Sequence, residues 1–373
     1  MAEPIRVLHV FGNLDLGGAE SRIMDLYRHI DRERVQFDFL VHTEKECFFD
    51  KEVKELGGCI YRIPRFRVYN YFQYKKALKR FFDEHHDYKV VQGHMTSTAA
   101  IYLPIAKKTG VFSVAAHARS AGTDKGIKGT LTRILRKSLP QKTDYMFTCS
   151  EIAGISVFGE KAVEEGKTIF IPNAIQCDSF AYDEKKREKL RKELGLTDCY
   201  VIGHVGRFHY AKNHEYLIKV FADLAKTDAS ERYKLLLLGE GEGMAQAKEL
   251  AKQLKIADDV IFAGNKSNVY DYYQTMDFFV YPSRYEGLPG TVVEAQASGL
   301  PCLISDRICR EVAITDLVEY MSIDIAPQEW ADYIVAAKKY CRISPIEALQ
   351  KAGFDVNTQA ERMMKFYETG IWK

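Results

Sequence analysis

The sequence predicts a protein of the α/β class with two Rossmann-like domains, each a parallel sheet covered by helices on both faces. Short apolar runs of the kind that buried parallel strands show alternate with amphipathic segments along the chain. This alternation starts twice, each time with a strand that opens into a glycine-containing loop. The 373 residues also suffice for about two domains.

The first run of elements occupies the N-terminal half. We expect strands at residues 7–11, 37–42, 90–92, 112–116 and 145–149, and helices at 20–29, 51–56 and 71–85. Ser150 follows the last of these strands and is a candidate N-cap for the next helix.

The second run occupies the C-terminal half. We expect strands at residues 200–205, 235–238, 260–262, 278–281 and 301–305, and helices at 183–194, 215–226, 243–254, 269–276 and 291–298. Because the join lies near 171–174, we assign residues 1–172 to the first domain and 173–355 to the second. A C-terminal helix, at about 356–373, is expected to pack back onto the first domain.

Bulk composition excludes several classes of protein. Hydrophobic residues make up 46% of the chain and charged residues 28%, as in an ordinary soluble protein. No apolar run approaches the roughly 18 residues of a membrane helix, and residues 5–11 are too short for a signal peptide, so we expect a cytoplasmic location. The eight cysteines form no C-x-x-C pair, so we expect neither a disulfide framework nor a zinc site.

Positive charge is concentrated in one segment of the first half. Residues 62–142 contain 17 basic and four acidic residues, a net charge of +13. Near residues 65–72, cations alternate with aromatic residues, as they do in helices that lie on membranes. A solvated basic face is the simpler interpretation, but the pattern favours peripheral contact with an anionic membrane or another anionic partner.

The first candidate ligand-binding motif runs from Glu286 to Glu294 and follows the strand at 278–281. Gly290, Thr291 and Val292 would lie at a helix N-terminus, where backbone N–H groups favour an anion such as a diphosphate. Two carboxylates, one on each side, would accept hydrogen bonds from hydroxyls at both ends of such a ligand. The spacing of the two glutamates is weak evidence without this context.

The second motif places Arg207 and Lys212 just beyond the strand at 200–205, after Gly206. Two cations at a strand end could neutralise a leaving diphosphate. Two solvated surface cations are the alternative interpretation.

Two further motifs follow strands in the first half. Gly17 and Gly18 allow close approach of the backbone to a ligand, or else form a tight structural turn. His117 follows the strand at 112–116 and could touch a substrate, and His94 is a weaker candidate of the same kind. A purely structural role is the alternative for both histidines.

Together and in this order, these motifs resemble those of the retaining glycosyltransferases of family four, which have the GT-B fold of two Rossmann-like domains facing each other across a cleft. The resemblance runs over nearly the whole chain. Many members have Phe after the first glutamate, whereas Gly287-Leu288-Pro289-Gly290 is closer to the capsule and exopolysaccharide branch and leaves the sugar preference open. The turn at 171–174 and the loop at 238–241 also match family motifs.

The resemblance implies a role for each matched residue. Glu286 would bind the donor sugar and Glu294 the ribose, while Arg207 and Lys212 would bind the diphosphate. Gly17 and Gly18 would approach it from the acceptor-binding N-terminal domain, and His117 would line the cleft. The remaining donor contacts implied for the C-terminal domain are Gly206, Asn268, Val269, Gly287, Leu288, Gly290, Thr291 and Val292.

The resemblance therefore predicts a metal-independent, retaining hexosyltransferase without a cofactor. It would transfer a hexose from a nucleotide sugar, most simply a UDP-sugar, to a growing glycan or lipid-linked acceptor in cell-surface polysaccharide synthesis. The sequence contains no Asp-x-Asp metal motif.

A nucleotide-sugar epimerase, or another nucleotide-sugar-binding protein of this fold, is the alternative to a transferase. A dehydrogenase is disfavoured because neither first-strand loop contains G-x-G-x-x-G, and no nucleic-acid-binding motif accompanies the basic segment.

Overall fold

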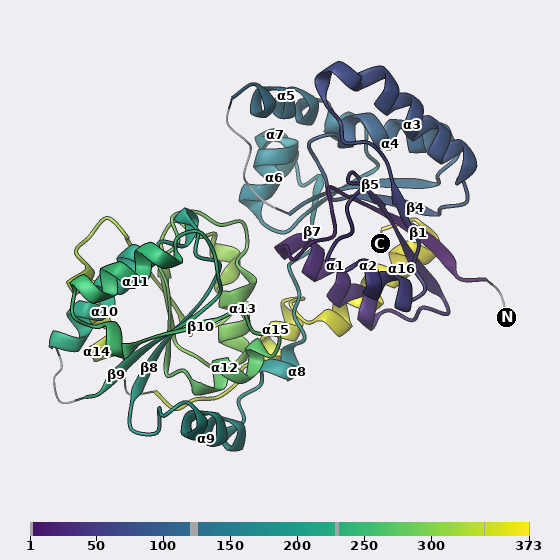
Figure 1. Ribbon diagram of the computed structural model, residues 1–373. Helices are drawn as coiled ribbons and strands as arrows, with labels where there is room; N and C mark the ends of the chain where they lie inside the picture. Colours follow the sequence, from purple (N-terminus) through teal and green to yellow (C-terminus); the bar gives the residue numbers. More distant parts are fainter. Residues whose placement is uncertain (1–2, 120–125, 228–230, 339, 373) are drawn as a thin grey trace. The chain divides into compact units, whose positions relative to one another are not determined.

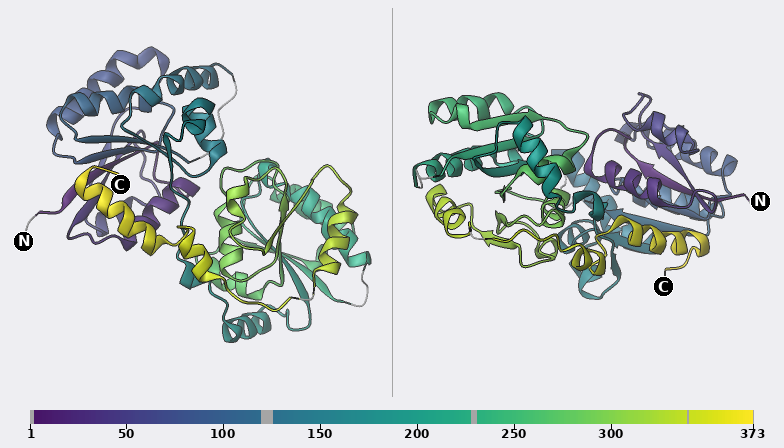
Figure 2. Two further views of the ribbon diagram at one scale, coloured as in Figure 1. Left: turned by 180° about the vertical axis from the view of Figure 1, so that it is seen from behind. Right: turned by 90° about the horizontal axis from the view of Figure 1, so that it is seen from below.

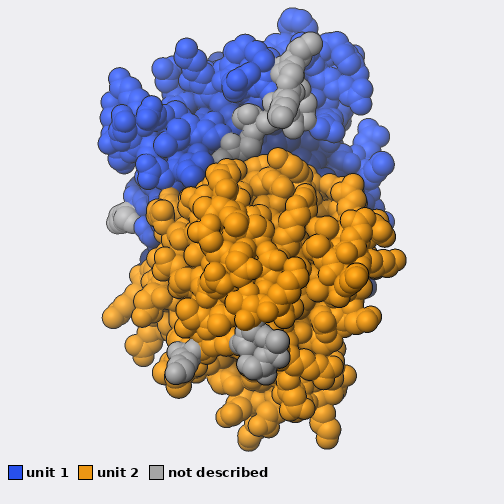
Figure 3. Space-filling model, turned by 90° about the vertical axis from the view of Figure 1, so that its left-hand side faces the viewer, with its two compact units in different colours: residues 1–174, 355–373 blue, residues 175–354 orange. Residues whose placement is uncertain are grey.

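The computed structural model describes residues 3–119, 126–227, 231–338 and 340–372. The chain forms two compact units, of which unit 1 comprises residues 1–174 and 355–373 and unit 2 comprises residues 175–354 (Figures 1 and 3). It passes between the units at 174–175 and 354–355, beside the expected domain limits of 172–173 and 355–356. Residues 120–125, which belong to the basic segment 62–142 and include Lys125, lie outside the described residues.

Unit 1 is built on a parallel sheet whose described strands have the order β3-β2-β1-β4-β5-β6-β7. The strands are β1 (Ile5–Phe11), β2 (Val35–Val41), β3 (Ile60–Arg62), β4 (Val90–Gly93), β5 (Ser113–Ala118), β6 (Tyr145–Thr148) and β7 (Thr168–Phe170). Every residue of β2 is buried, because helices cover both faces of the sheet.

The helices of unit 1 include one from the end of the chain. They are α1 (Gly18–His29), α2 (Asp50–Glu55), α3 (Tyr71–Glu84), α4 (Ala99–Lys108), α5 (Gly126–Lys137), α6 (Glu151–Phe158), α7 (Glu160–Glu164) and α16 (Val356–Thr369). Helix α16 packs beside α1, on the face of the sheet opposite α3 and α4 (Figures 1 and 2). Ile23 and Met24 of α1 and Met363 and Tyr367 of α16 share one apolar core.

Unit 2 repeats the plan with a parallel sheet of order β10-β9-β8-β11-β12-β13 among the described residues. Its strands are β8 (Tyr200–Val205), β9 (Tyr233–Leu238), β10 (Val260–Gly264), β11 (Phe278–Tyr281), β12 (Cys302–Ser305) and β13 (Val318–Met321). Its helices are α8 (Cys177–Phe180), α9 (Glu184–Glu193), α10 (His214–Thr227), α11 (Met244–Gln253), α12 (Val269–Thr275), α13 (Gly290–Ala297), α14 (Pro327–Ala336) and α15 (Ile346–Lys351).

These two sheets confirm the predicted α/β class and its two Rossmann-like folds. Ser150 caps α6 as expected, since its hydroxyl accepts a hydrogen bond from the Ala153 N–H at 3.2 Å. Sequence reasoning missed the edge strands β3, β7 and β13, which are three or four residues long and half-buried or exposed. Such strands lack the continuous apolar run that marks a central strand.

No helix within the described ranges is long and apolar enough to span a bilayer.

Buried histidines make the stability of this fold depend on pH. Burial lowers the pKa of His9 to about 3 and the pKa values of His42 and His214 to about 4. Burial also holds the pKa values of the His94, His117 and His204 side chains well below the ordinary 6.5. These six rings are therefore neutral in the folded protein down to mildly acidic pH.

We expect the free energy of unfolding to fall as the pH is lowered from 7.5 to 5. In that window the unfolded histidines bind protons and the buried ones do not, so acid favours the unfolded chain. Well below pH 6.5, each histidine contributes about 1.4 kcal/mol per pH unit. Urea denaturation at several pH values measures how steeply the free energy of unfolding changes with pH. His42→Asn should reduce this dependence, and a slope of zero in the native chain would contradict the prediction.

Candidate functional site

The carboxyl edge of the unit 2 sheet gathers most of the predicted ligand-binding residues. The strands β10, β9, β8 and β11 are parallel neighbours, so the loops that follow them lie at one edge. These loops carry Gly206 and Arg207 after β8, Asn268 and Val269 after β10, and the segment 282–289 after β11.

Lys212 and Glu286, from two of these loops, form a partly buried ion pair. The Lys212 Nζ lies 2.6 Å from the Glu286 Oε1, and the two side chains are 20% and 16% exposed. Tyr281, the last residue of β11, joins them: its hydroxyl accepts a hydrogen bond from the Lys212 ammonium and donates one to the Glu286 Oε1 at 3.2 Å. The structure thus brings together two residues that sequence reasoning assigned to adjoining parts of one ligand.

The charge on Lys212 is maintained against its burial. Burial alone would lower the pKa of the ammonium, but Tyr281 and Glu286 more than offset it and raise that pKa above its ordinary value. Beneath the pair, His204 donates from Nδ1 to the Val280 carbonyl at 2.9 Å, and burial keeps its pKa well below 6.5. The His204 ring is therefore neutral, and the Lys212 ammonium keeps its positive charge.

Helix α13 begins at Gly290, one residue earlier than predicted, after Pro289 at the N-cap. Of the three amides expected to face an anion, that of Val292 already donates to the Pro289 carbonyl at 3.2 Å. The amides of Gly290 and Thr291 make no hydrogen bond among the described residues. Two N–H groups at this helix end are therefore available for a ligand.

Glu294 lies one turn into α13, because the helix starts at Gly290. It is 5% exposed, and the Tyr273 hydroxyl donates to its Oε2 at 3.0 Å. The same hydroxyl lies 3.1 Å from the Thr291 carbonyl. Tyr273 therefore fixes the second glutamate of the motif relative to the start of the helix.

Glycine backbones meet at this edge. Gly239, directly after β9, has φ of +129°, and a Cβ there would lie 2.2 Å from the Gly206 carbonyl oxygen. Only glycine fits this position, because both the left-handed conformation and the contact exclude a side chain. The loop predicted from residues 238–241 thus supports the segment that carries Arg207.

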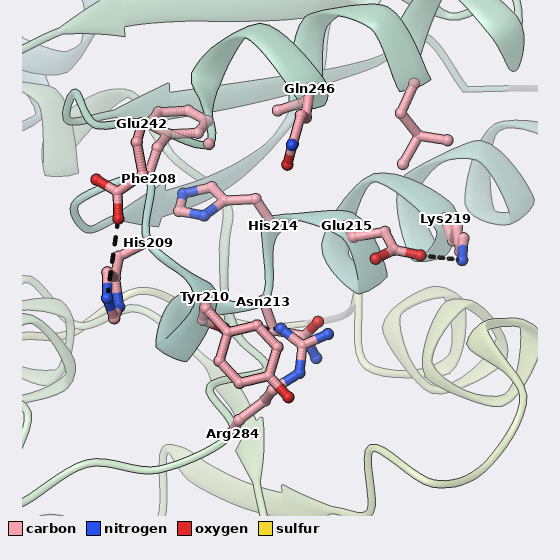
Figure 4. A pocket seen from close by; sticks show the side chains of 13 residues that line it. Phe208, His209, Tyr210, Asn213, His214, Glu215, Lys219, Glu242, Gln246 and Arg284 are labelled. Atoms are coloured by element: carbon pink, nitrogen blue, oxygen red, sulfur yellow. Dashed lines mark hydrogen bonds and ion pairs between the residues drawn. The ribbon is translucent and has the colours of Figure 1, made fainter. Parts of the chain in front are cut away.

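Arg207 itself is exposed and makes no side-chain hydrogen bond or ion pair within the described part of the chain. Next to it lies a hollow of about 600 Å³, shown in Figure 4. Its polar lining includes an ion pair between Glu215 and Lys219 (2.6 Å) and a looser contact between His209 and Glu242 (3.8 Å). None of the predicted donor-binding residues lines it, so the hollow borders the candidate site without containing it.

In unit 1, Gly17 and Gly18 lie at the start of α1, beyond the end of β1. Neither has a positive φ, so the backbone does not require glycine for a tight turn. A Cβ on Gly18 would meet nothing within 4 Å, whereas one on Gly17 would meet the Glu20 carboxylate. The open space at Gly18 favours the alternative in which a ligand approaches the backbone.

His117 is fully buried in a cluster with His9 and His94. The Tyr367 hydroxyl donates to the Gln92 Oε1 at 2.7 Å, which turns the amide nitrogen of Gln92 toward the His117 Nδ1 at 2.9 Å. Since this Nδ1 accepts, the neutral ring carries its proton on Nε2. Ligand contact by His117 stays a prediction.

Sequence reasoning missed Tyr281 and Tyr273, which bind the two glutamates of the motif. Both were treated as parts of apolar elements. The signal available was that a buried tyrosine needs a partner for its hydroxyl.

In the described residues, no group of three or more histidine, cysteine or acidic side chains is placed to hold a metal ion.

Comparison with known proteins agrees with this geometry. The profile described as Glycosyl transferases group 1 matches residues 186–338, and that of Glycosyltransferase Family 4 matches residues 16–179. EpsF of Bacillus subtilis, a glycosyltransferase by its name, is 32% identical over 99% of this chain and 97% of its own. The capsular polysaccharide biosynthesis glycosyltransferase CapH of Staphylococcus aureus is 23% identical over 97% of this chain and 98% of its own.

The fold is shared with solved structures. Anabaena HepE in complex with UDP-glucose matches with a TM-score of 0.76 and 16% identity, covering 98% of this chain and all of that one. The chain therefore belongs to the glycosyltransferases with the GT-B fold. Within them it is of the family-four type, as the sequence resemblance predicted.

Tyr281→Phe tests whether the tyrosine holds the ion pair. The change removes a buried hydroxyl that bonds to two charged groups, so we expect the stability of unit 2 to fall by about 1.5–3 kcal/mol. Tyr272→Phe is the control, because Tyr272 is also buried, although it is 9% exposed against 0% for Tyr281, and its hydroxyl has no hydrogen bond within the described residues. Urea denaturation followed by circular dichroism compares the two, and equal effects would argue against the assigned role.

Proposed function

We propose that this protein transfers a hexose, with retention of anomeric configuration, from a nucleotide-diphosphate sugar to a growing glycan or lipid-linked acceptor of a cell-surface polysaccharide. The observation that carries the proposal is the Lys212–Glu286 pair beside the unpaired amides of Gly290 and Thr291. This arrangement places a fixed cation, a helix N-terminus and a carboxylate at one sheet edge, which suits a ligand with a diphosphate flanked by hydroxyls.

The donor is proposed to be a UDP-sugar, and each site residue has a place along it. Arg207, Lys212 and the amides at the start of α13 bind the diphosphate. Glu286 binds hydroxyls of the sugar and Glu294 those of the ribose. Gly206, Gly287 and Leu288 shape the surface under the donor, and Asn268 and Val269 bracket the base. The UDP-glucose in the HepE structure supports the choice of nucleotide.

The chemistry follows from where charge develops. As the bond between sugar and diphosphate breaks, negative charge grows on the phosphate oxygens, and Lys212 and Arg207 stabilise it. The acceptor hydroxyl attacks from the face that the diphosphate leaves, and the leaving phosphate takes its proton. Two cations and a helix N-terminus supply the charge that a metal ion supplies elsewhere, so we expect activity to survive chelation by EDTA.

The acceptor is assigned to unit 1. Gly17 and Gly18 begin α1 with open space beside Gly18, and the buried His117 carries its proton on Nε2. CapH acts in capsular polysaccharide biosynthesis by its name, which supports a glycan or lipid-linked acceptor. Peripheral contact with an anionic membrane through the segment 62–142 belongs to the same proposal, and it would place the enzyme at the inner face of the cell membrane.

A thermal-shift screen of nucleotides tests the donor. A ligand at 100 times its dissociation constant stabilises the folded protein by about 2.7 kcal/mol, so UDP and UDP-sugars should raise the melting temperature. ADP, GDP and their sugars serve as controls. If no nucleotide raises it, the assignment of the donor site is wrong.

Glu286→Gln tests the chemistry with the donor that the screen finds. The amide keeps the shape of the side chain but removes the charge that balances Lys212 and replaces one of the two oxygens that accept from sugar hydroxyls by a donor, so we expect transfer to fall on the order of 10²-fold or more. Glu242→Gln, an exposed carboxylate in the neighbouring hollow, is the control. The rate of transfer is measured as the release of UDP when a lipid extract supplies the acceptor. Normal turnover by the variant would refute the role of Glu286, and sugar isomerisation without transfer would favour an epimerase.

A further inference from the structure

The positive charge of segment 62–142 is not spread evenly over the surface of unit 1. Several of its cations are committed to contacts within the unit. Arg62 binds the Asp50 carboxylate, Lys107 binds Asp144 at 2.7 Å, and Arg136 is buried and donates to Thr96 at 2.9 Å. Arg119 donates to the side chain of Asn173 at 3.1 Å. These four cations are held by contacts within the unit, so the charge available to an outside partner is sought elsewhere in the segment.

Part of it lies on helix α3, which has two distinct faces. Tyr74, Leu78, Phe81 and Phe82 are buried against the rest of unit 1. On the other face, Phe72, Lys75, Lys76 and Lys79 are exposed and follow one another at helical spacing. This cationic face runs along the whole first half of the helix.

A hollow of about 730 Å³ lies beside this face, between α3 and α4. Four lysines line it, Lys75, Lys76 and Lys79 from α3 and Lys108 from α4, against one carboxylate, that of Asp83. None of the four makes an ion pair with a carboxylate in the described part of the chain. The hollow thus presents unneutralised ammonium groups to an anion from outside.

Large apolar side chains stand next to the hollow. Phe72, which also lines it, is 84% exposed, and Tyr69 and Val68, in the turn before α3, are 81% and 65% exposed. An unpaired cationic hollow alone would suit any polyanion. Exposed aromatic and aliphatic groups on α3 and in the turn before it distinguish a membrane surface, where rings enter the headgroup region while lysine ammonium groups stay among the phosphates.

We propose that the exposed face of α3, with Phe72, Lys75, Lys76 and Lys79, docks the protein on a membrane of anionic lipid, together with Lys108 of α4 and with Val68 and Tyr69 of the turn before α3. Phe72 and Tyr69 enter the interface, and the lysines of the hollow bind lipid phosphate groups. The inference rests on the proposed function only in that a lipid-linked acceptor requires work at a membrane. It narrows the contact from a segment of 81 residues to one helix face and one hollow.

Binding of the full chain to vesicles tests the proposal. We expect co-sedimentation with vesicles of phosphatidylglycerol and phosphatidylcholine in equal parts, and little with phosphatidylcholine alone. Each lysine near an anionic surface contributes about a fivefold change in binding, so the variant with Lys75, Lys76 and Lys79 all changed to Gln should bind on the order of 100-fold more weakly. Phe72→Ser should also weaken binding, with less dependence on salt.

Helix α9 offers a matched control. Lys185, Lys186 and Lys189 have the same spacing, are equally exposed and lie in unit 2. Changing these three to Gln removes the same charge and should leave vesicle binding unchanged. Equal losses in the two triple variants would show attraction by net charge alone and overturn the proposal, as would indifference of the native chain to anionic lipid.

Two further measurements distinguish a membrane from other possible occupants of this face. Inorganic phosphate at the concentration of lipid phosphate should not displace the vesicles, and displacement would indicate a site for soluble phosphate instead. Dimerisation in sedimentation velocity that Phe72→Ser abolishes would assign the face to a second copy of the chain. The stabilisation by UDP should be the same in all these variants. Its absence from the native chain would refute the proposed donor site while leaving the vesicle result intact.

Discussion

The parallel alignment of strands is the constraint on which the rest of this structure depends. Parallel strands need crossover helices, and those helices bury both faces of the sheet. Polar side chains that follow the strands then have only the carboxyl edge to occupy. In unit 2, this is why Gly206, Lys212 and Glu286 come together from segments about 80 residues apart in the sequence.

The same constraint explains how a charged lysine persists in a largely buried position. The strand β11 ends at Tyr281, and its hydroxyl lies between Lys212 and Glu286. Together the two partners outweigh the cost of burial, so the cation is fixed before any ligand arrives. In the proposed reaction, a diphosphate would replace Glu286 as the counter-ion of Lys212 and release the carboxylate to the sugar. Binding would then exchange one ion pair for another, which limits the desolvation that the ligand has to drive.

The sequence predicts those features of the fold and of the site that leave a pattern along the chain. Central strands such as β9 and β11 contain continuous apolar runs, and their positions and parallel pairing follow from the pattern. Edge strands such as β3 have no such run and were missed. Glu286 and Lys212 follow strands and were singled out, whereas their contact with each other depends on side-chain directions that no spacing encodes.

The bridging tyrosines show the same limit. Tyr281 belongs to an apolar strand, and only its three-dimensional neighbours reveal that its hydroxyl has a function. The basic segment is a second example: its charge is evident from composition, but which cations are held within the unit depends on partners as distant as Asp144, which pairs with Lys107, and Asn173, which accepts a hydrogen bond from Arg119. Composition therefore predicted that the partner carries negative charge, and the structure was needed to locate the surface that binds it.

The position of α16 has a consequence for how the chain is made. Met363 and Tyr367 belong to the core of unit 1, yet they are synthesised after all of unit 2. On the ribosome, the first sheet must therefore wait with part of its apolar face uncovered while about 180 further residues are added. Unit 2 has its whole sequence in one stretch and can close its core first. The order in which the two halves reach their native state is thus expected to be the reverse of their order in the gene.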